Sequence, residues 1–389
     1  MESQQSIDRL LAEVEKELSW MNRHIPLTTT IAGEVASRDL SGITLCLNIH
    51  LDVKIIPVLA ALLSARARLL VLGCNPQTTR DGVVAYLKRL GAEVYAWKGM
   101  PEAERLKAMD QVIDEGFEFV SEMGADLTVH LLKSRPEAAF RVRAGMEATG
   151  TGILRLRDLH LPFPVFNWDD VALKEGFHNR YLVGLTVWNT FLNVTHLSLF
   201  GRRVLVVGYG PVGQGIARYA GMLGARIYVC DLDPVRQLEA VHAGFDVVDL
   251  EEGLPKAQVV VTATGREGVI GKRHFDLLAD ECILLNAGHS NREIDVDALL
   301  RFPTEEIRPF IEAIRLGERT IYLLARGAMF NLAAGPGDYF DAFDLTASLM
   351  LAGILFLVER GPTFPPGIHL LPPEVERKVA SLAARQYKP

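Results

Sequence analysis

The sequence predicts an α/β protein with two doubly wound parallel-sheet domains and a C-terminal segment that returns to the first domain. Three observations support this prediction. Short apolar runs alternate with amphipathic stretches along both halves of the chain, a pattern typical of parallel sheets with helices on both faces. A glycine-rich turn directly follows one apolar run near the middle of the chain. A chain of 389 residues is also long enough for two domains, each with its own core.

In the first half, apolar runs are expected to form strands with helices between them. The strands are 44–49, 68–74, 93–97 and 127–132, and the helices are 81–90 and 102–115. Two prolines interrupt this alternation at 161–166, before a helical run over about 171–199. This long helix leads into the glycine-rich strand and is the natural hinge. We therefore expect a substrate-binding domain over residues 1–184.

The second half is expected to form a nucleotide-binding Rossmann domain over residues 185–337. Its strands are 204–207, 227–230, 247–249, 259–264 and 283–286. After the turn at 335–337 (GPG) come an apolar helix through Glu359, a proline-rich loop and a closing helix. This last segment, 338–389, is expected to pack on the substrate-binding domain.

The turn at 208–215 (GYGPVGQG) has the Gly-x-Gly-x-x-Gly pattern of dinucleotide sites, and Asp231 follows 18 residues after Gly213. Gly208 allows a tight turn, Gly210 lets the backbone approach a pyrophosphate, and Gly213 lets the next helix pack closely. The helix N-terminus offers N–H groups to the phosphates. Asp231 can accept hydrogen bonds from a ribose diol and would repel a 2′-phosphate. A glycine triplet alone would fit an ordinary turn, but all parts together predict NAD rather than NADP.

The composition is that of an ordinary globular protein, with 49% hydrophobic residues, 23% charged residues and a net charge of −7. An acidic balance without a basic run argues against nucleic acid as a partner. The cysteines lie far apart in apolar runs, which fits buried thiols and neither a disulfide framework nor a metal site; they are Cys46, Cys74, Cys230 and Cys282. Residues 1–18 lack a secretory pattern, and the apolar stretch 347–358 is too short to span a bilayer. We expect a cytoplasmic protein with no membrane partner.

Several motifs together resemble the S-adenosyl-L-homocysteine hydrolase family. They are the turn at 208–215, 95–99 (YAWKG), 124–128 (GADLT), 286–289 (NAGH) with 293–295 (EID), and 367–372 (GIHLLP). Any one of them could occur by chance, but their order and spacing are specific. The resemblance runs from roughly Ser41 to Pro372.

The resemblance implies an enzyme in which NAD is a built-in catalyst. A nucleoside is oxidised at C3′, the resulting ketone acidifies the 4′ proton, and the 5′ substituent leaves after a base removes that proton. Water then adds at C5′, and the ketone is reduced again. The family's habit of forming tetramers, together with the apolar helix, suggests a homodimer or homotetramer.

The resemblance also assigns candidate catalytic residues. His50 follows the first strand and is expected to handle protons around the 5′ position, and His289 faces the cofactor and the same region. Lys174 is expected to activate the 3′ hydroxyl and to act as the base at C4′, provided that burial and cationic neighbours lower its pKa. His178 stands where the family has an aspartate and is a further catalytic candidate.

The residues expected to hold NAD come from several segments. Asn331 matches an asparagine that contacts the nicotinamide carboxamide, and Thr149 and Thr151 match threonines that reach the cofactor from the other domain. The remaining candidates are Gly208, Gly210, Pro211, Val212, Gly213, Asp231, Asn179, Thr264, Asn286 and Gly288.

The chain departs from the family at the substrate contacts. Met123 replaces a catalytic aspartate, and Ala148 replaces a glutamate that binds the sugar hydroxyls. Asp338 replaces a histidine near the base, and Asp52 and Lys54 replace a threonine and a glutamate after the first histidine; all three are therefore substrate-binding candidates. Because an unpaired buried polar group costs about 1–3 kcal/mol, efficient turnover of S-adenosylhomocysteine is doubtful.

Three hypotheses follow. The first is an NAD-dependent enzyme of this family with a non-standard nucleoside or nucleophile. The second is a true S-adenosylhomocysteine hydrolase with compensating replacements, such as Asp52 standing in for the lost diol ligand. The third is a catalytically silent NAD-binding regulator, in which replacement of Lys174 or His289 would leave function unchanged.

Overall fold

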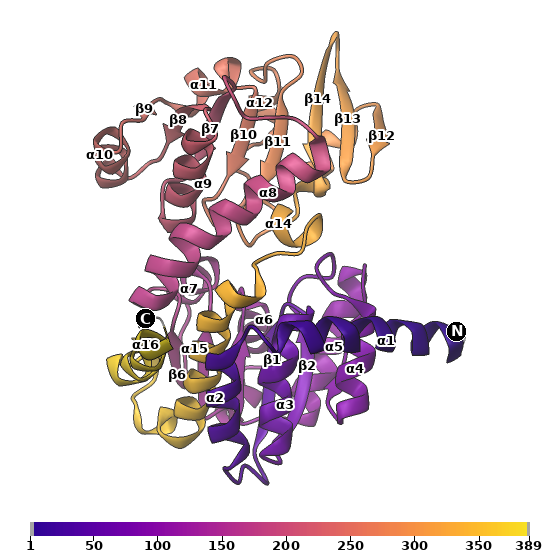
Figure 1. Ribbon diagram of the computed structural model, residues 1–389, viewed down its shortest axis with the longest axis vertical. Coiled ribbons are helices and arrows are strands. Elements are labelled where there is room, and N and C mark those ends of the chain that lie inside the picture. Colours follow the sequence, from indigo (N-terminus) through magenta and orange to yellow (C-terminus); the bar gives the residue numbers. More distant parts are fainter. Residues whose placement is uncertain (1–3, 387–389) are drawn as a thin grey trace. The chain divides into compact units, whose positions relative to one another are not determined.

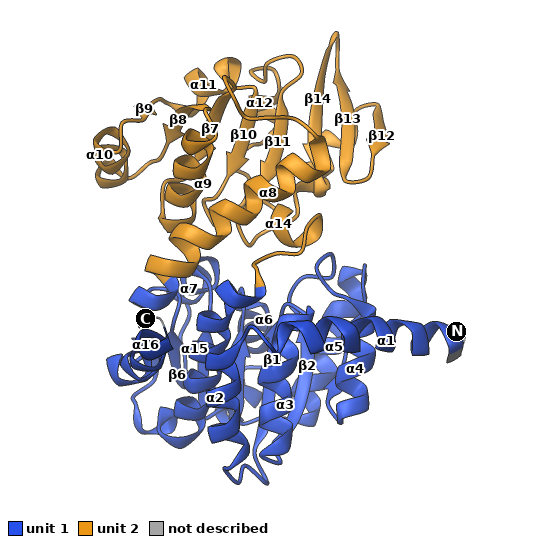
Figure 2. Ribbon diagram, in the orientation of Figure 1, with its two compact units in different colours: residues 1–174, 340–389 blue, residues 175–339 orange. Residues whose placement is uncertain are grey.

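Two mainly parallel β-sheets organise the chain, and each belongs to one of two compact units (Figures 1 and 2). The computed structural model describes residues 4–386, so the first three residues of the predicted amphipathic N-terminus lie outside the described part. Unit 1 comprises Met1–Lys174 and Phe340–Pro389, and unit 2 comprises Glu175–Tyr339. The predicted α/β class and the return of the C-terminal segment to the first unit are confirmed.

Within the described residues, the sheet of unit 1 is entirely parallel, with the strand order β15-β6-β5-β4-β1-β2-β3. Its strands are β1 (Thr44–Ile49), β2 (Arg68–Gly73), β3 (Glu93–Val94), β4 (Phe119–Glu122), β5 (Ala144–Glu147), β6 (Pro164–Asn167) and β15 (Gly367–Leu370). Its α-helices are α1 (Gln4–Met21), α2 (Pro26–Ala36), α3 (Ile56–Ser64), α4 (Asp81–Leu90), α5 (Glu102–Glu115), α6 (Asp126–Ser134), α7 (Gly150–Leu156), α15 (Phe340–Glu359) and α16 (Pro373–Gln386).

Both faces of this sheet are buried because successive side chains of a strand point to opposite sides. Leu45 and Leu47 of β1 belong to a core shared with α2, α3 and α15. Cys46, between them, belongs to a second core shared with α5 and α6. The continuous apolar runs of the sequence therefore reflect burial on two faces rather than one.

In unit 2, the sheet has the order β12-β13-β14-β11-β10-β7-β8-β9 over the described residues, and only β12, β13 and β14 form antiparallel pairs. Its strands are β7 (Arg203–Val207), β8 (Arg226–Cys230), β9 (Asp246–Val247), β10 (Val259–Thr262), β11 (Ile283–Asn286), β12 (Thr304–Arg308), β13 (Ile311–Leu316) and β14 (Arg319–Leu324). Its α-helices are α8 (Val183–Thr195), α9 (Pro211–Met222), α10 (Pro234–His242), α11 (Leu250–Gly253), α12 (Lys272–Phe275), α13 (Val296–Leu299) and α14 (Phe330–Ala333).

The parallel part of each sheet reverses its strand order once, and ligands of such sheets bind at the carboxyl ends of the strands beside this reversal. In unit 1 the reversal lies between β1 and β4, and in unit 2 it lies between β7 and β10. His50 follows β1, and the turn at Gly208 follows β7. The topology therefore places one predicted catalytic residue and the predicted cofactor turn at the two switch points, each in its own unit.

Several predicted elements were wrong. Residues 127–132, predicted as a strand, belong to α6, and the strand is β4, just before it. Short apolar runs do not distinguish a strand from a buried helix. Here the Glu122 carboxylate accepts hydrogen bonds from the N–H groups of Leu127 and Thr128, at 2.8 and 2.9 Å, and so begins the helix.

Two further regions also differ from the prediction. The proline-containing stretch 161–166 includes most of β6. Proline is tolerated because Pro164 is the first residue of the strand, where a missing N–H does not interrupt the hydrogen bonds between strands. The long helix predicted over 171–199 begins as a π-helix, Leu173–Leu182, and continues as α8. Gly184 of α8 lies against Gly215 of α9, where a Cβ would come within 2.4 Å of the Gly215 carbonyl carbon. The hairpin strands β12 and β13 were not predicted, and β12 is exposed throughout.

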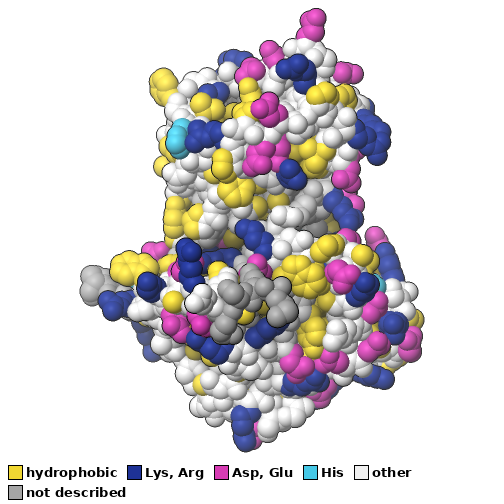
Figure 3. All heavy atoms as spheres, turned by 90° about the vertical axis from the view of Figure 1, so that its right-hand side faces the viewer, with side chains coloured by type: hydrophobic (Ala, Val, Ile, Leu, Met, Phe, Trp, Pro, Cys, Tyr) yellow, Lys and Arg dark blue, Asp and Glu magenta, His cyan; other side chains and the backbone are white. Residues whose placement is uncertain are grey.

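Charged side chains of both signs are interspersed on the surface. Figure 3 shows one face, on which Lys and Arg side chains lie among Asp and Glu side chains rather than gathering by sign. Paired examples in unit 1 are Arg80 with Glu17 and Arg89 with Glu15, both at 2.6 Å. This face offers no broad basic surface for a polyanion.

The helix α15 is long and apolar enough to pass a composition test for a membrane span, but 72% of its apolar window is buried inside the protein. It is the core helix of unit 1, where Leu349, Met350 and Ile354 pack with α2 and α3. Its apolar character thus follows from its burial.

Asp344 of α15 ties the C-terminal segment to the N-terminal part of unit 1. The helix α2 has no side-chain cap of its own, since Ile25 occupies its N-cap position. The Asp344 carboxylate accepts hydrogen bonds from the N–H groups of Leu27 and Thr28, at 2.9 and 2.7 Å. One buried side chain thereby caps a helix 316 residues away in sequence.

We predict that Asp344→Ala lowers the free energy of unfolding of unit 1 by about 1–3 kcal/mol, because two buried N–H groups lose their acceptor. Hydrogen exchange of the first α2 amides, measured with urea unfolding, is the test. Asp341→Ala on the same helix is the control, since Asp341 is exposed and its carboxylate accepts a bond from the adjacent Ala342 N–H. Equal effects of the two substitutions would contradict the prediction.

Candidate functional site

The glycine turn of unit 2 has the geometry that a dinucleotide requires. Gly208 has φ +94°, and a Cβ there would lie 2.6 Å from the Ala263 carbonyl oxygen. A Cβ on Gly213 would lie 1.9 Å from the Gly208 carbonyl oxygen, so α9 can start only with glycine at this position. By contrast, a Cβ on Gly210 would meet nothing within 4 Å. The space beside Gly210 is therefore open to a ligand.

The start of α9 and Asp231 complete this cradle. Pro211 and Val212 are the first residues of α9, whose first-turn N–H groups have no partner within the helix. Asp231 follows β8, and its carboxylate accepts hydrogen bonds from the Tyr209 N–H at 2.5 Å and the Asp233 N–H at 2.9 Å. Asp231 thus braces the turn and keeps acceptor capacity for a ribose hydroxyl.

Asn331 is the second part of unit 2 that fits a cofactor. Its Nδ2 donates to Thr186 Oγ1 at 3.0 Å, which fixes the orientation of the amide. Its Oδ1 is buried and has no hydrogen-bond partner among residues 4–386. A buried acceptor without a partner costs free energy unless a ligand satisfies it. The NH₂ of a nicotinamide carboxamide is such a donor.

The side chain of Asn286 forms its hydrogen bonds with groups of the protein. Its Nδ2 lies 2.8–3.1 Å from the carbonyl oxygens of Gly288, Ser290 and Gly327. Its Oδ1 accepts from the Gly288 N–H and from Thr262 Oγ1, at 2.8 and 3.1 Å. This side chain holds the loop after β11 in place, and its contact with the cofactor stays a prediction.

Glu293 holds the neighbouring loops and was not recognised as a site residue from the sequence. Its carboxylate accepts from the N–H groups of Thr264 and Gly265 and from the Thr264 hydroxyl, all within 2.8–2.9 Å. A Cβ on Gly288 would lie 1.7 Å from Glu293 Oε1. The hydroxyl of Thr264, a predicted cofactor ligand, is therefore directed at Glu293. The available signal in the sequence was an acidic residue in the 293–295 motif (EID), beside the apolar Ile294.

The structure brings together two positions at which this chain departs from the family. His178 Nε2 lies 3.3 Å from Asp338 Oδ2, and both side chains are buried in unit 2. The family has an aspartate at the first position and a histidine at the second. In the sequence, the two substitutions look independent. In the structure, they form one histidine–carboxylate pair, in which the histidine and the aspartate have exchanged positions relative to the family.

The other candidates of unit 2 lie on or beside the same elements. Asn179, next to His178 on the π-helix, is buried, and its carbonyl oxygen would lie 3.6 Å from a Cβ on Gly215. His289 is half-buried in the loop after β11. Their roles toward cofactor and substrate stay predictions.

In unit 1, Lys174 has an anionic neighbour. Its Nζ lies 3.5 Å from Asp169 Oδ1, and both side chains are largely buried. Cationic neighbours were expected from the sequence, whereas this neighbour is a carboxylate; the base role of Lys174 stays a prediction. Asp169 was not among the predicted site residues, although an Asp-Asp pair one residue after a strand, with its first member five residues before the lysine, was a usable signal.

Asp52 and Lys54 pair with each other. Lys54 Nζ and Lys54 N–H both lie 2.8 Å from the Asp52 carboxylate, and the lysine side chain is buried. Asp52 also caps the short 3₁₀ helix Val53–Ile55. The carboxylate of Asp52 is therefore engaged within the protein, and its role as a substitute ligand of a ribose diol stays a prediction. Contact of Lys54 with a substrate stays a prediction.

Two buried glutamates organise the loops beside these residues. Glu147 accepts from the N–H groups of Gly124 and Ala125 at 2.8 and 3.0 Å, and from Thr149 N–H and Oγ1. Glu122 accepts from Leu127, Thr128 and Asn48. Burial, and then the Glu122 charge, raise the pKa of Glu147 to about 8. Neither glutamate is available to replace the carboxylates missing at 123 and 148.

Thr149 is part of this arrangement. Its hydroxyl donates to Glu147 at 2.7 Å and accepts from the Gly152 N–H at 2.9 Å, which makes it the N-cap of α7. Its side chain therefore caps the helix. A contact of Thr149 with the cofactor, which stays a prediction, would then involve its backbone. Thr151 is half-buried in the first turn of the same helix.

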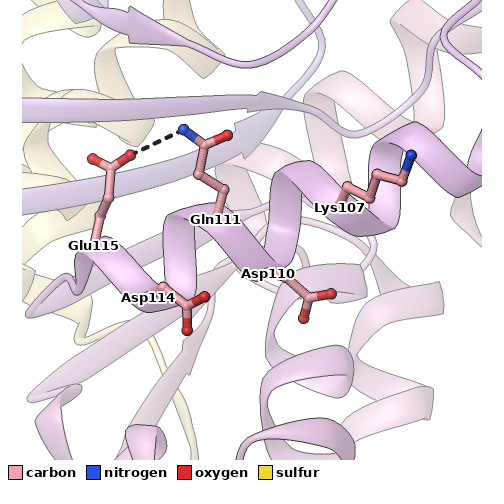
Figure 4. A pocket seen from close by; sticks show the side chains of 5 residues that line it. All are labelled: Lys107, Asp110, Gln111, Asp114 and Glu115. Atoms are coloured by element: carbon pink, nitrogen blue, oxygen red, sulfur yellow. Dashed lines mark hydrogen bonds between the residues drawn. The ribbon is translucent and has the colours of Figure 1, made fainter.

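A surface hollow elsewhere in unit 1 does not belong to this site. It is lined by Lys107, Asp110, Gln111, Asp114 and Glu115, all on one side of α5 (Figure 4). Glu115 pairs with Arg68, the first residue of β2, so the hollow lies toward the amino ends of the strands. Ligands of a doubly wound sheet bind at the opposite ends.

The fold and cradle define the chain as an α/β protein with a dinucleotide-binding unit, and comparison with known proteins makes this specific. The S-adenosyl-L-homocysteine hydrolase NAD-binding domain matches residues 179–337. The chain is 35% identical over 376 residues to an adenosylhomocysteinase of Thermotoga maritima, covering 95% of this chain and 93% of that protein. It is 33% identical over 374 residues to an S-inosyl-L-homocysteine hydrolase of Methanopyrus kandleri, covering 94% and 88%. The chain belongs to the S-adenosyl-L-homocysteine hydrolase family, and residues 179–337 are its NAD-binding domain.

Solved structures with a similar fold are more distant. An NADPH-dependent glyoxylate/hydroxypyruvate reductase from Sinorhizobium meliloti matches 84% of this chain and 97% of its own, with a TM-score of 0.44 at 14% identity. A likeness this weak supports no conclusion on activity.

We predict that Gly210→Val abolishes NAD binding and leaves the apoprotein as stable as the wild type. The new Cβ lies more than 4 Å from the described atoms around it, and the side chain fills the space expected for the pyrophosphate. Calorimetric titration with NAD and thermal unfolding without it are the measurements. Gly271→Val is the control, because Gly271 occupies the N-cap of another helix, α12. A Gly210 variant that binds NAD with wild-type affinity would show that the cradle lies elsewhere.

We also predict that wild-type unit 1 loses stability as the pH rises from 5 to 8. The folded pKa of Glu147 lies near 8, above its ordinary value of 4.5, so its titration stabilises the fold below pH 4.5 and this contribution is lost toward pH 8. The stability difference between wild type and Glu147→Gln should therefore shrink over this range by more than about 1 kcal/mol. Urea unfolding at several pH values measures it, with exposed Glu137→Gln as control. If the stability difference between wild type and Glu147→Gln grew with pH, the predicted direction of the pH dependence would be wrong.

Proposed function

We propose that this protein is an NAD-dependent enzyme that oxidises a nucleoside-like substrate transiently at C3′ and so permits elimination or addition at C5′. The observation that carries the proposal is the cradle of unit 2. The open space beside Gly210 and the unsatisfied Oδ1 of Asn331 meet two separate needs of one dinucleotide, its pyrophosphate and its carboxamide. Bound NAD⁺ supplies a reversible oxidant for the C3′ carbinol.

The chain's own residues would handle the protons. Lys174 takes the proton from O3′ and releases it to solvent, and the neutral amine then takes the proton from C4′; Asp169, 3.5 Å from its Nζ, orients the amine. Asp169 also offers the sugar hydroxyls a carboxylate, close to Gly150 at the start of α7, where a Cβ would lie 3.5 Å from its Oδ2. His50 and His289 are proposed to serve the 5′ position.

We further propose that the substrate differs from S-adenosylhomocysteine in its base or its 5′ group. Met123 and Ala148 offer no carboxylate, and the adjacent Glu122 and Glu147 are occupied by backbone N–H groups. Relatives with nearly equal identity are named for an adenosyl and for an inosyl thioether, which supports a family in which the base varies.

A second candidate function is hydrolysis of S-adenosyl-L-homocysteine itself. The observation in its favour is the 35% identity to the Thermotoga maritima adenosylhomocysteinase over 95% of this chain. Asp169 would then replace the missing contact to the sugar.

The test is turnover of a nucleoside panel by the NAD-loaded protein. The panel contains S-adenosyl- and S-inosyl-L-homocysteine and free nucleosides, and the readouts are the near-ultraviolet absorbance of reduced cofactor and chromatography of products. We expect one member other than S-adenosylhomocysteine to have a kcat/KM at least about tenfold higher, a discrimination of about 1.4 kcal/mol. Lys174→Ala should abolish turnover, whereas Lys133→Ala, on the exposed surface of α6, should not.

The outcomes separate the hypotheses. Preference for S-adenosylhomocysteine would establish the second candidate. Unchanged cofactor absorbance with every nucleoside would leave a catalytically silent NAD-binding protein. A homodimer or homotetramer and a cytoplasmic location stay predictions, of which sedimentation velocity tests the first.

A further inference from the structure

Thr78 lies beside the predicted catalytic histidine of unit 1. His50 directly follows β1 at the switch point, and Thr78 is in the loop between β2 and α4. His50 Nδ1 and Thr78 Oγ1 are 2.7 Å apart, and the threonine is buried. Thr78 was not among the residues predicted from the sequence. At this distance, either atom could be the donor.

The second contact of Thr78 decides the donor. Its Oγ1 lies 3.0 Å from the carbonyl oxygen of Asn75, and a hydroxyl has one hydrogen to donate. If that hydrogen pointed to His50, two oxygen acceptors would face each other at 3.0 Å with no proton between them. The hydrogen therefore goes to Asn75, and Oγ1 accepts a hydrogen bond from Nδ1–H of His50.

The loop holds this arrangement in place. The Asn75 carbonyl also accepts from the Thr78 N–H at 3.1 Å and from Thr79 Oγ1 at 3.2 Å, and Asn75 Oδ1 accepts from the Gln77 N–H at 3.0 Å. At the end of the loop, the Arg80 N–H donates to the Leu51 carbonyl at 3.0 Å, next to His50. The threonine hydroxyl is therefore oriented before any ligand arrives.

We propose that Thr78 is a positioning residue that fixes the tautomer of His50, with the proton on Nδ1 and the lone pair of the neutral ring on Nε2. In the reaction, Nε2 is then the nitrogen that exchanges protons at the 5′ end of the nucleoside. Only this second statement rests on the proposed function. The tautomer itself follows from the contacts of unit 1.

The experiment compares Thr78→Val, which keeps the shape and removes the hydroxyl, with Thr78→Ser, which keeps the hydroxyl. Nitrogen NMR of the full-length protein, labelled at histidine, reports which ring nitrogen carries the proton, and loss of the signal in His50→Gln assigns it. We expect protonated Nδ1 in the wild type and in Thr78→Ser. In Thr78→Val, we expect a shift toward the other tautomer.

Kinetics add a second readout. With the best substrate of the nucleoside panel, Thr78→Val should lower kcat about tenfold or more with little change in KM, since general acid–base catalysis contributes about 10²–10⁴-fold. Thr78→Ser should recover most of the loss. If the Thr78 side chain only supported the fold, the two variants would not differ in kcat at an unchanged KM in this way.

The outcomes are distinct. A wild-type spectrum with the proton on Nε2 would overturn the proposal, whether or not Thr78→Val folds. Unchanged His50 signals in a folded Thr78→Val would do the same. If the wild type turns over no nucleoside, the proposed function fails, while the spectrum still decides the tautomer.

Discussion

The loops at the carboxyl ends of both sheets depend on buried carboxylates that accept hydrogen bonds from backbone N–H groups. Glu122 and Glu147 hold the turns after β4 and β5, and Glu293 holds those after β10 and β11. Backbone N–H groups at a turn or helix start have no partner within the helix, and burial makes a missing acceptor costly. A carboxylate satisfies several such groups at once. Asp344 does the same for α2, within the core of unit 1.

This framework explains how the site can change while its shape is kept. The loop backbones are held by Glu122 and Glu147, whose carboxylates face inward, so the adjacent positions are free to vary. Met123 and Ala148 are such positions, and only their backbone N–H groups, which donate to the carbonyl oxygens of Asn48 and Glu122, take part in holding the loops. The substrate contacts of this chain could therefore diverge from the family without loss of the fold. The same engagement prevents the framework glutamates from taking over the lost contacts.

Three carboxylates of the chain each lie beside a cationic or titratable side chain. Asp169 lies beside Lys174, Asp52 beside Lys54, and Asp338 beside His178. Each of these carboxylates is within 3.5 Å of a cationic or titratable partner, as burial of a charged group requires. The exchange of histidine and aspartate between 178 and 338 leaves a histidine beside a carboxylate, and it changes which group each backbone segment presents. These two substitutions are therefore best understood as a pair.

Local patterns in the sequence determined the α/β class, the return of the C-terminal segment, the glycine turn and the family. The class and the turn follow from short-range physics, because apolar periodicity reports burial and Gly208 and Gly213 sit where a Cβ would collide with backbone, whereas the family rests on the resemblance of several motifs. Single runs were less reliable, as residues 127–132 show, since a carboxylate five residues before Leu127 starts a helix there. Tertiary structure alone decided which polar groups are available. Asn286, Thr149 and Asp52 match a site pattern but are engaged with neighbours, whereas Asp169, Glu293 and Thr78 matter through partners that the sequence does not reveal. Hydrogen-bond capacity is limited, and only the folded chain shows where it is used.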